Sequence, residues 1–159
     1  MQIIYIIAFY LITCKILPYF LYPNYFKKSK VENYDKLKKL SAKLKASNKT
    51  HTIKNVYDYI TNTYSGDTQK FKIKNLRTIL FFGDFSTTDI LDKKQFLWCH
   101  NQNRLFKSIL INTGLFKEEE IIIKKRLFMS FFIHQWLYFK LEDKEIIADP
   151  FYKIFKVSY

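Results

Sequence analysis

The sequence predicts an α+β fold in which helices come first and an antiparallel sheet follows. Between residues 31 and 64, apolar residues recur three or four positions apart, which is the spacing of one helix face. After residue 120 the spacing changes to two, which is typical of strands. The chain has 159 residues, of which 48% are hydrophobic, so it can build one core with a short appendage.

The N-terminal segment, residues 1–26, is predicted to direct the protein to a membrane. Residues 3–22 are almost wholly apolar and are interrupted by Lys15 and Pro18. A helix of about 20 residues spans about 30 Å, the thickness of the hydrocarbon core of a bilayer. A single membrane anchor is therefore expected, with its orientation left open. The alternative is a secretion signal, although a positively charged start and a clear small-residue cleavage site are missing.

Residues 27–50 are predicted to form a basic amphipathic helix or linker. Between Lys27 and Lys54 there are ten lysines against only Glu32 and Asp35, and the whole chain has a net charge of +13. A basic stretch beside an apolar segment is typical of contact with acidic lipid, and a solvated helix face explains it equally well. Nucleic acid is not expected as a partner, because no aromatic-basic recognition motif accompanies these lysines.

The predicted domain, residues 51–159, begins with helices. Apolar residues from Ile53 to Tyr64 form one helix face, which Ser65-Gly66-Asp67 ends. A later helix begins near Cys99 and ends at Gly114, a natural C-terminal stop. Between these two helices, the sequence predicts a short helix around residues 76–80 and a loop over residues 81–89.

The second half of the domain is predicted to be a sheet. Strands are expected at residues 121–128, 132–141 and 145–148, with a turn over residues 142–144. On the middle strand two faces are distinguished: one carries His134, Trp136 and Tyr138, and the other carries Ile133, Leu137 and Phe139.

Cys99, His134 and Asp149 are the candidate catalytic residues. A thiol is a useful nucleophile only as thiolate, and a helix N-terminus and a nearby imidazole together lower its pKa. Cys99 lies where the helix begins, and His134 lies on a strand expected to pack against that helix. A third group must orient the imidazole, and Asp149 at the end of the neighbouring strand can do so. Alone, each residue also fits a purely structural role, so the prediction depends on the combination.

The cysteines and histidines do not indicate a metal site or a disulfide. Cys14 lies in the apolar N-terminal segment, far in sequence from Cys99, and the three histidines are scattered singly. No metal and no cofactor are therefore expected.

The order and context of these residues resemble the transglutaminase-like superfamily, a branch of the papain-like thiol enzymes. The resemblance covers roughly residues 52–152. It depends on Cys99 at a helix start closed by Gly114, on the strand motif His134-Gln135-Trp136, and on Asp149-Pro150 after the next strand. The chain departs from the family pattern in three places: Leu97 replaces a common glycine, Asn101-Gln102-Asn103 replaces small residues, and Ile146 replaces a usual tryptophan.

The resemblance implies a papain-like core and a thiol enzyme that acts on amide bonds of a protein or peptide through an acyl-enzyme. Cys99 attacks, His134 shuttles the proton, and Asp149 orients His134; Gln95 or Trp98 are candidates to hold the oxyanion. Water is the default acceptor, so hydrolysis by a peptidase or amidase is expected rather than crosslinking. The alternative is a catalytically inactive binding module on the same scaffold, tethered at a membrane.

Overall fold

A computed structural model describes residues 2–12, 31–66, 86–92, 97–128 and 132–159 of the chain. The described part confirms an α+β fold with a four-stranded antiparallel sheet and helices packed on it. Its elements in chain order are α1 (Gln2–Leu11), α4 (Asp35–Leu44), α5 (Lys49–Thr63), α7 (Thr87–Asp92), α8 (Cys99–Asn112), the 3-10 turn η4 (Glu118–Glu120), β1 (Ile121–Phe128), β2 (Phe132–Lys140), β3 (Glu145–Asp149) and β4 (Ile154–Ser158).

The sheet is a meander in the order β1-β2-β3-β4, with every neighbouring pair antiparallel. The first three strands agree with the predicted ones to within one residue at each end. The fourth strand was not predicted; it follows a tight turn in which Lys153 has a φ of 57°. On β2, Leu137 and Phe139 are buried, whereas Trp136 and Tyr138 are half-buried, as the predicted alternation requires. The side chain of Ile133 lies outside the described part.

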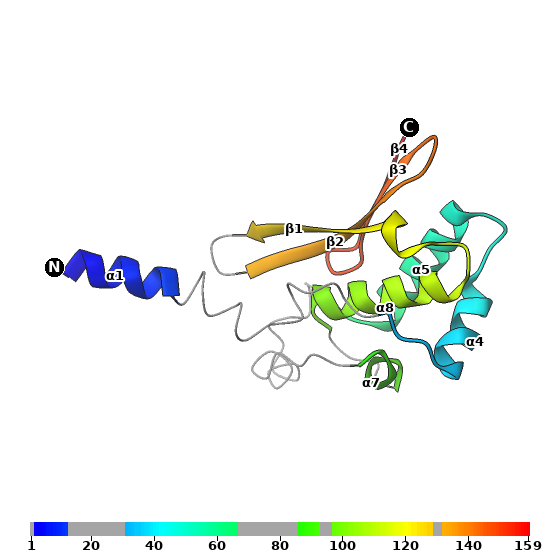
Figure 1. Cartoon of the computed structure of the whole chain (residues 1–159), viewed down its shortest axis with the longest axis horizontal. Coiled ribbons are helices and arrows are strands. Elements are labelled where there is room, and N and C mark those ends of the chain that lie inside the picture. The colour runs from blue at the N-terminus through cyan, green and yellow to red at the C-terminus, as the bar shows by residue number, and fades with distance from the viewer. Residues whose placement is uncertain (1, 13–30, 67–85, 93–96, 129–131) are drawn as a thin grey trace.

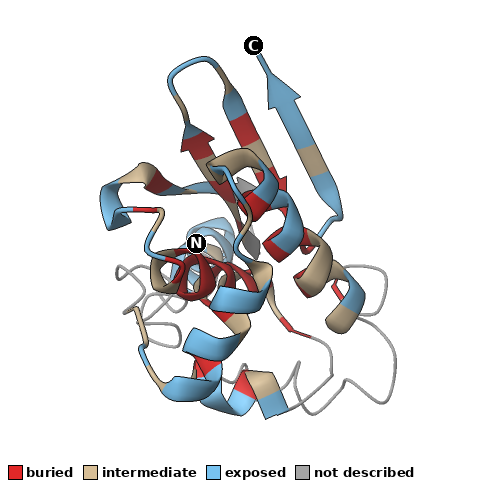
Figure 2. Cartoon of the chain, turned by 90° about the vertical axis from the view of Figure 1, so that its right-hand side faces the viewer, coloured by how far each residue is buried: buried red, intermediate tan, exposed pale blue. Residues whose placement is uncertain are grey.

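Helix α8 is the centre of the molecule. It contacts α4, α5 and α7 as well as β2, and these helices all lie on one side of the sheet (Figure 1). Figure 2 shows that the buried residues gather between the helices and the sheet, while the outer surfaces are exposed. Phe106 of α8 contacts Phe139 of β2 with ring centroids 6.2 Å apart. The core is therefore built where the apolar stripe of α8 meets β2.

Helix α4 belongs to this core although its sequence is basic. Leu37 is fully buried in the same apolar cluster as the core residues of α5 and α8, and the α4 lysines lie on the exposed surface. Just before α4, Glu32 accepts a hydrogen bond from Arg104 of α8 at 2.6 Å and another from the Thr87 backbone N–H at 2.9 Å. One carboxylate of the lysine-rich segment thus ties α4, α7 and α8 together.

Helix α7 corrects one prediction. A loop was expected over residues 81–89, but a helix begins at Thr87; residues 81–85 and the short helix expected around residues 76–80 lie outside the described part. The cause is Ser86 at the N-cap position: its Oγ accepts the Asp89 N–H at 3.1 Å and donates to the Asp89 carboxylate at 2.6 Å. Ile90 then buries the apolar face of this short helix against the core.

At the N-terminus, α1 comprises Gln2–Leu11, and its isoleucine, tyrosine and phenylalanine side chains are largely exposed. The remainder of the predicted apolar span, up to Tyr22, falls outside the described part. Among the residues that the structure describes, no helix combines the length and the hydropathy needed to cross a bilayer.

Candidate functional site

Cys99 is the first residue of α8, as predicted. The chain enters the helix through Trp98, which is extended, with φ −66° and ψ 157°. The entry is fixed from the side by Gln102, whose amide group donates to the Leu97 carbonyl at 3.0 Å and to the Ser65 carbonyl at 3.3 Å. The Leu97 N–H also donates to the Ser65 carbonyl, at 3.1 Å. The thiol is thereby held at the positive end of the α8 dipole.

His134 and Asp149 come together from β2 and the end of β3. The distance from His134 Nε2 to Asp149 Oδ2 is 2.5 Å. The second carboxylate oxygen, Oδ1, accepts the backbone N–H of Tyr152 at 3.2 Å. Both oxygens of this buried carboxylate are therefore engaged, and the imidazole is held in one orientation. Because Asp149 occupies Nε2, Nδ1 is the ring nitrogen left for the thiol.

The thiol and the imidazole have pKa values shifted in opposite directions. Burial raises the pKa of Cys99, but hydrogen bonds and charge interactions with His100 and His134 outweigh burial and lower the pKa to about 6. Burial lowers the pKa of His134, but hydrogen bonds to Asp149 and Cys99 and the charges of both groups raise it to about 9. Between these two values, a thiolate beside an imidazolium is the favoured protonation state.

His100 is a site residue that the sequence analysis overlooked. It is the second residue of α8, and it is hydrogen-bonded to the Cys99 thiol, as His134 is. The only signal in the sequence was its position directly after the cysteine, since nothing in the resemblance assigns a role to it. The thiol thus has two imidazole neighbours, one on its own helix and one across from it on the sheet.

Aromatic rings surround the site. The His134 ring contacts Tyr152, Trp136 and Phe151, with centroid distances of 4.5, 5.8 and 5.9 Å. Trp98 stacks on Phe151 at 6.1 Å, and these two side chains pack around Cys99, which is 4% exposed. These rings keep water from the polar groups and so strengthen the electrostatic interactions among them.

Of the two predicted oxyanion candidates, only Trp98 lies within the described residues. Gln95 lies outside the described residues. Trp98 is adjacent to the thiol, and its backbone carbonyl accepts the Gln102 N–H at 3.1 Å, which begins the hydrogen bonding of α8. The first turn of a helix carries N–H groups without intrahelical acceptors, so it also suits a developing oxyanion.

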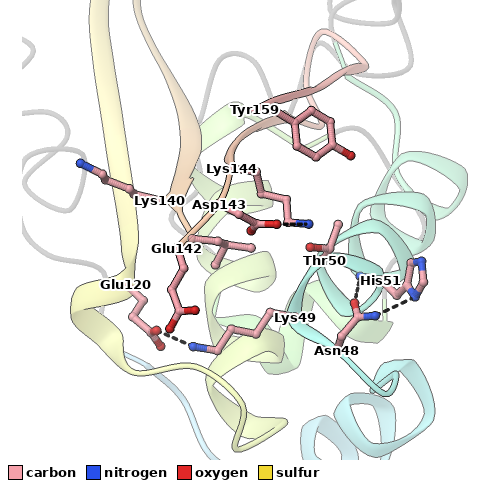
Figure 3. Close-up of a pocket in the computed structure, with 11 residues that line it drawn as sticks. Asn48, Lys49, Thr50, His51, Glu120, Lys140, Glu142, Asp143, Lys144 and Tyr159 are labelled. Carbon is pink, nitrogen blue, oxygen red and sulfur yellow. Dashed lines mark hydrogen bonds and ion pairs between the residues drawn. The ribbon is translucent and has the colours of Figure 1, made fainter.

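A cavity of about 730 Å³ lies at a different place, between the start of α5 and the turn from β2 to β3 (Figure 3). Lys49 Nζ and Glu120 Oε1, which both belong to its lining, form an ion pair at 2.5 Å. Asn48 caps α5, because its Oδ1 accepts the His51 N–H at 2.8 Å. None of the three predicted catalytic residues lines it. Two ion pairs, Lys49–Glu120 and Lys144–Asp143, lie in its lining, and the cavity is separate from the predicted site.

Within the described residues, no group of three or more His, Cys, Asp or Glu side chains is arranged to hold a metal ion. No protein-family model, curated protein or solved structure matches this chain.

Proposed function

We propose that the protein is a thiol enzyme with a papain-like, transglutaminase-like core that acts on amide bonds through Cys99, His134 and Asp149. The observation that carries this proposal is the 2.5 Å contact between His134 and Asp149, next to a thiol at the N-terminus of α8. A carboxylate that fixes one imidazole nitrogen while the other faces a thiol is the arrangement that nucleophilic catalysis requires.

The proposed reaction has two steps. The Cys99 thiolate attacks the carbonyl carbon of an amide, and the resulting oxyanion is held by N–H groups of the first turn of α8. The His134 imidazolium donates its proton to the amine nitrogen, the C–N bond breaks, and a thioester with Cys99 remains. Neutral His134 then takes a proton from water, whose oxygen attacks the thioester. The C–S bond breaks, a carboxylic acid is released, and the Cys99 thiolate beside the His134 imidazolium is restored. Hydrolysis is preferred over amine transfer, because water is the default acceptor.

A second candidate is a binding module on the same scaffold that has lost catalysis. It is favoured by the 4% exposure of Cys99 beneath Trp98 and Phe151, since a substrate carbonyl must reach the sulfur. The replacement of the family's small residues by buried Asn101, Gln102 and Asn103 points the same way. The two candidates differ in whether the thiol is accessible and reactive in the folded protein.

Alkylation by iodoacetamide at neutral pH, followed by mass mapping, separates the two candidates. If the protein is an enzyme, iodoacetamide should label Cys99 rapidly. A probe that carries a peptide-like amide group should remain covalently attached to Cys99. A binding module should show Cys99 labelled only after unfolding in denaturant. Replacing Cys99 with Ser provides the blank for both measurements.

For location, the proposal is a membrane attachment through residues 1–26, supported by the exposed apolar side chains of α1. Deleting residues 1–26 should move the protein from the membrane to the soluble fraction with its fold retained. If the truncated protein stays with membranes but leaves in a high-salt wash, attachment is instead through the lysines between Lys27 and Lys54. Recovery of the full-length protein in the medium would favour the secreted alternative.

A further inference from the structure

The face of the sheet turned away from the helices has an unusual composition. Strand register places Ile122 and Lys124 of β1 opposite Tyr138 and Trp136 of β2, with Arg126 next along the same side of β1. The same register sets Ile147 of β3 between Tyr138 and Lys156 of β4. We call these residues the open face. Its centre is aromatic and aliphatic, and cations border it on both edge strands.

The centre of the other face packs on the core. Its positions include Leu137 and Phe139 of β2 with Ile146 and Ala148 of β3, all fully buried under the helices. On the open face, by contrast, Trp136, Tyr138 and Ile147 are half-buried and Ile122 is 39% exposed. In Figure 1 the helices α4, α5, α7 and α8 lie on the opposite side of the sheet, and α8 meets the side of the open face only where Cys99 contacts His134. The open face therefore offers apolar side chains to a partner and not to the core.

The cations of the open face lack carboxylate partners within the described residues. Lys124, Arg126 and Lys156 are exposed and form no ion pair there; Lys124 instead lies over the Tyr138 ring, 5.0 Å from its centroid. Glu145, at the far end of this face, interacts with the Tyr138 hydroxyl and raises its pKa. Two basic residues of α8 do have carboxylate partners: Arg104 pairs with Glu32 at 2.6 Å and Lys107 with Glu118 at 2.7 Å.

The open face is continuous with the proposed site. Trp136 follows His134 on the same side of β2, and the two rings are stacked at 5.8 Å. A chain lying along β2 over Tyr138 and Trp136 would reach His134 next. A strand presents side chains alternately to its two sides, so an extended chain could place apolar and acidic groups on this surface in turn.

We propose that the open face binds an acidic, apolar-containing polypeptide segment and leads it to Cys99 as substrate. This inference rests on the proposed function, because it is the amide chemistry at His134 and Cys99 that selects a polypeptide. Apolar side chains of the segment pack on Trp136, Tyr138 and Ile147. Its carboxylates pair with Lys124 and Arg126 on one edge and with Lys156 on the other, which gives charge complementarity without displacing an existing ion pair.

The test is a binding measurement on the full chain carrying Cys99→Ser, so that turnover does not interfere. The probe is a fluorescein-labelled peptide in which Glu alternates with Leu and Phe, and anisotropy reports binding. A matched peptide with Lys in place of Glu is the ligand control. We expect the acidic peptide to bind at least ~10-fold more tightly than the basic one, with an affinity that falls as salt is raised.

Two triple variants separate the surface from the net charge. Lys124→Glu, Arg126→Glu and Lys156→Glu together reverse the open face, and Lys38→Glu, Lys39→Glu and Lys43→Glu make the same charge change on exposed positions of α4. The open-face variant should lose at least ~10-fold in affinity and the α4 variant less than ~3-fold. Circular dichroism verifies that both variants are folded.

Several results would overturn the inference. Equal losses of affinity in the two triple variants would show that binding depends on net charge and not on the open face. If the acidic peptide does not bind at all, the open face is not a binding surface for it. Tighter binding of a single-stranded oligonucleotide, lost in the open-face variant, would assign the surface to nucleic acid. The proposed function fails separately: an inert Cys99 in the alkylation assay would refute catalysis even if the acidic peptide binds to the open face.

Discussion

The two ends of helix α8 differ in the polarity of their buried side chains. Its first turn carries Cys99 and the buried polar residues Asn101, Gln102 and Asn103, each no more than 4% exposed. Its last three turns carry fully buried apolar residues, namely Leu105, Phe106, Ile109 and Leu110. The helix stops in the ordinary way, with Gly114 at φ 74° and its N–H donating to the Ile111 carbonyl at 3.0 Å.

This difference separates stability from chemistry along one helix. Burying polar groups gains little or costs free energy, whereas burying Leu and Phe side chains gains about 1.5–3 kcal/mol each. The apolar end therefore holds the fold together, and that stability allows the polar end to keep a thiol and two imidazoles in close contact. Substitutions at the two ends should consequently change different measured quantities.

The largest expected effect is at the apolar end. Leu110→Ala should lower the free energy of unfolding by about 2–5 kcal/mol, because it removes buried methyl groups and leaves a cavity between α8 and the core. Urea unfolding followed by circular dichroism measures this loss. The alkylation rate of Cys99 in the folded protein should stay unchanged. Leu40→Ala on α4 is the matched control and should cost less, since Leu40 is only half-buried.

The next effect is at the polar end. Because the pKa of Cys99 is lowered to about 6, the thiolate predominates at pH 7 and alkylation should rise with pH through an inflection near that value. His134→Ala removes one of the two imidazoles that lower this pKa, while burial continues to raise it. Alkylation near neutral pH should then slow by about 10–100-fold, with the inflection moved toward or above the ~8.5 of an ordinary thiol.

His51→Ala is the control for this experiment, because His51 is exposed on α5 and does not contact the site. An unchanged profile in His134→Ala would contradict the proposed triad. If His100→Ala removed the reactivity instead, the imidazole on α8 would be the partner that matters, and the role of His134 would have to be reassigned.

Asp149→Asn should have a smaller effect on the same measurement. Loss of the carboxylate charge lowers the pKa of His134 from about 9, so the imidazolium that stabilises the thiolate is less populated near neutral pH. Alkylation of Cys99 should slow by about 3–10-fold, less than in His134→Ala, because the imidazole itself remains. Steady-state turnover, once a substrate is found, should fall further than alkylation does.

Two glycines, one near each end, provide the last pair of substitutions. Gly114→Ala should lower the free energy of unfolding by about 1–2 kcal/mol, because a Cβ is strained at φ 74° although nothing lies within 4 Å of it. Its Cys99 alkylation rate should be unaffected. At Gly66, a Cβ would lie 2.3 Å from the Phe151 carbonyl oxygen, so Gly66→Ala must displace the chain that follows Asp149. That variant should slow alkylation, and equal rates in the two variants would contradict the comparison.

Periodicity in the sequence was sufficient to predict the regular elements. The helical spacing around α5 and α8 and the alternation of β1 to β3 are local signals, because each face is buried by one partner layer. The helix start at Cys99 and the stop at Gly114 were predicted because they too are local signals in the sequence. Two local signals were missed: the N-cap serine of α7, Ser86, and the strand β4 that follows the turn at Lys153.

The sequence by itself determined the fold class, most of the elements, and three residue types suited to acyl transfer. Only the tertiary structure decided that His134 Nε2 lies 2.5 Å from Asp149 Oδ2. It also decided that His100 interacts with the Cys99 thiol, as His134 does, and that the basic helix α4 buries Leu37. The physical reason is that contacts between distant segments depend on strand register and on which faces become buried. Periodicity within one segment says which face is apolar, but the partner of that face is chosen only when the whole core closes.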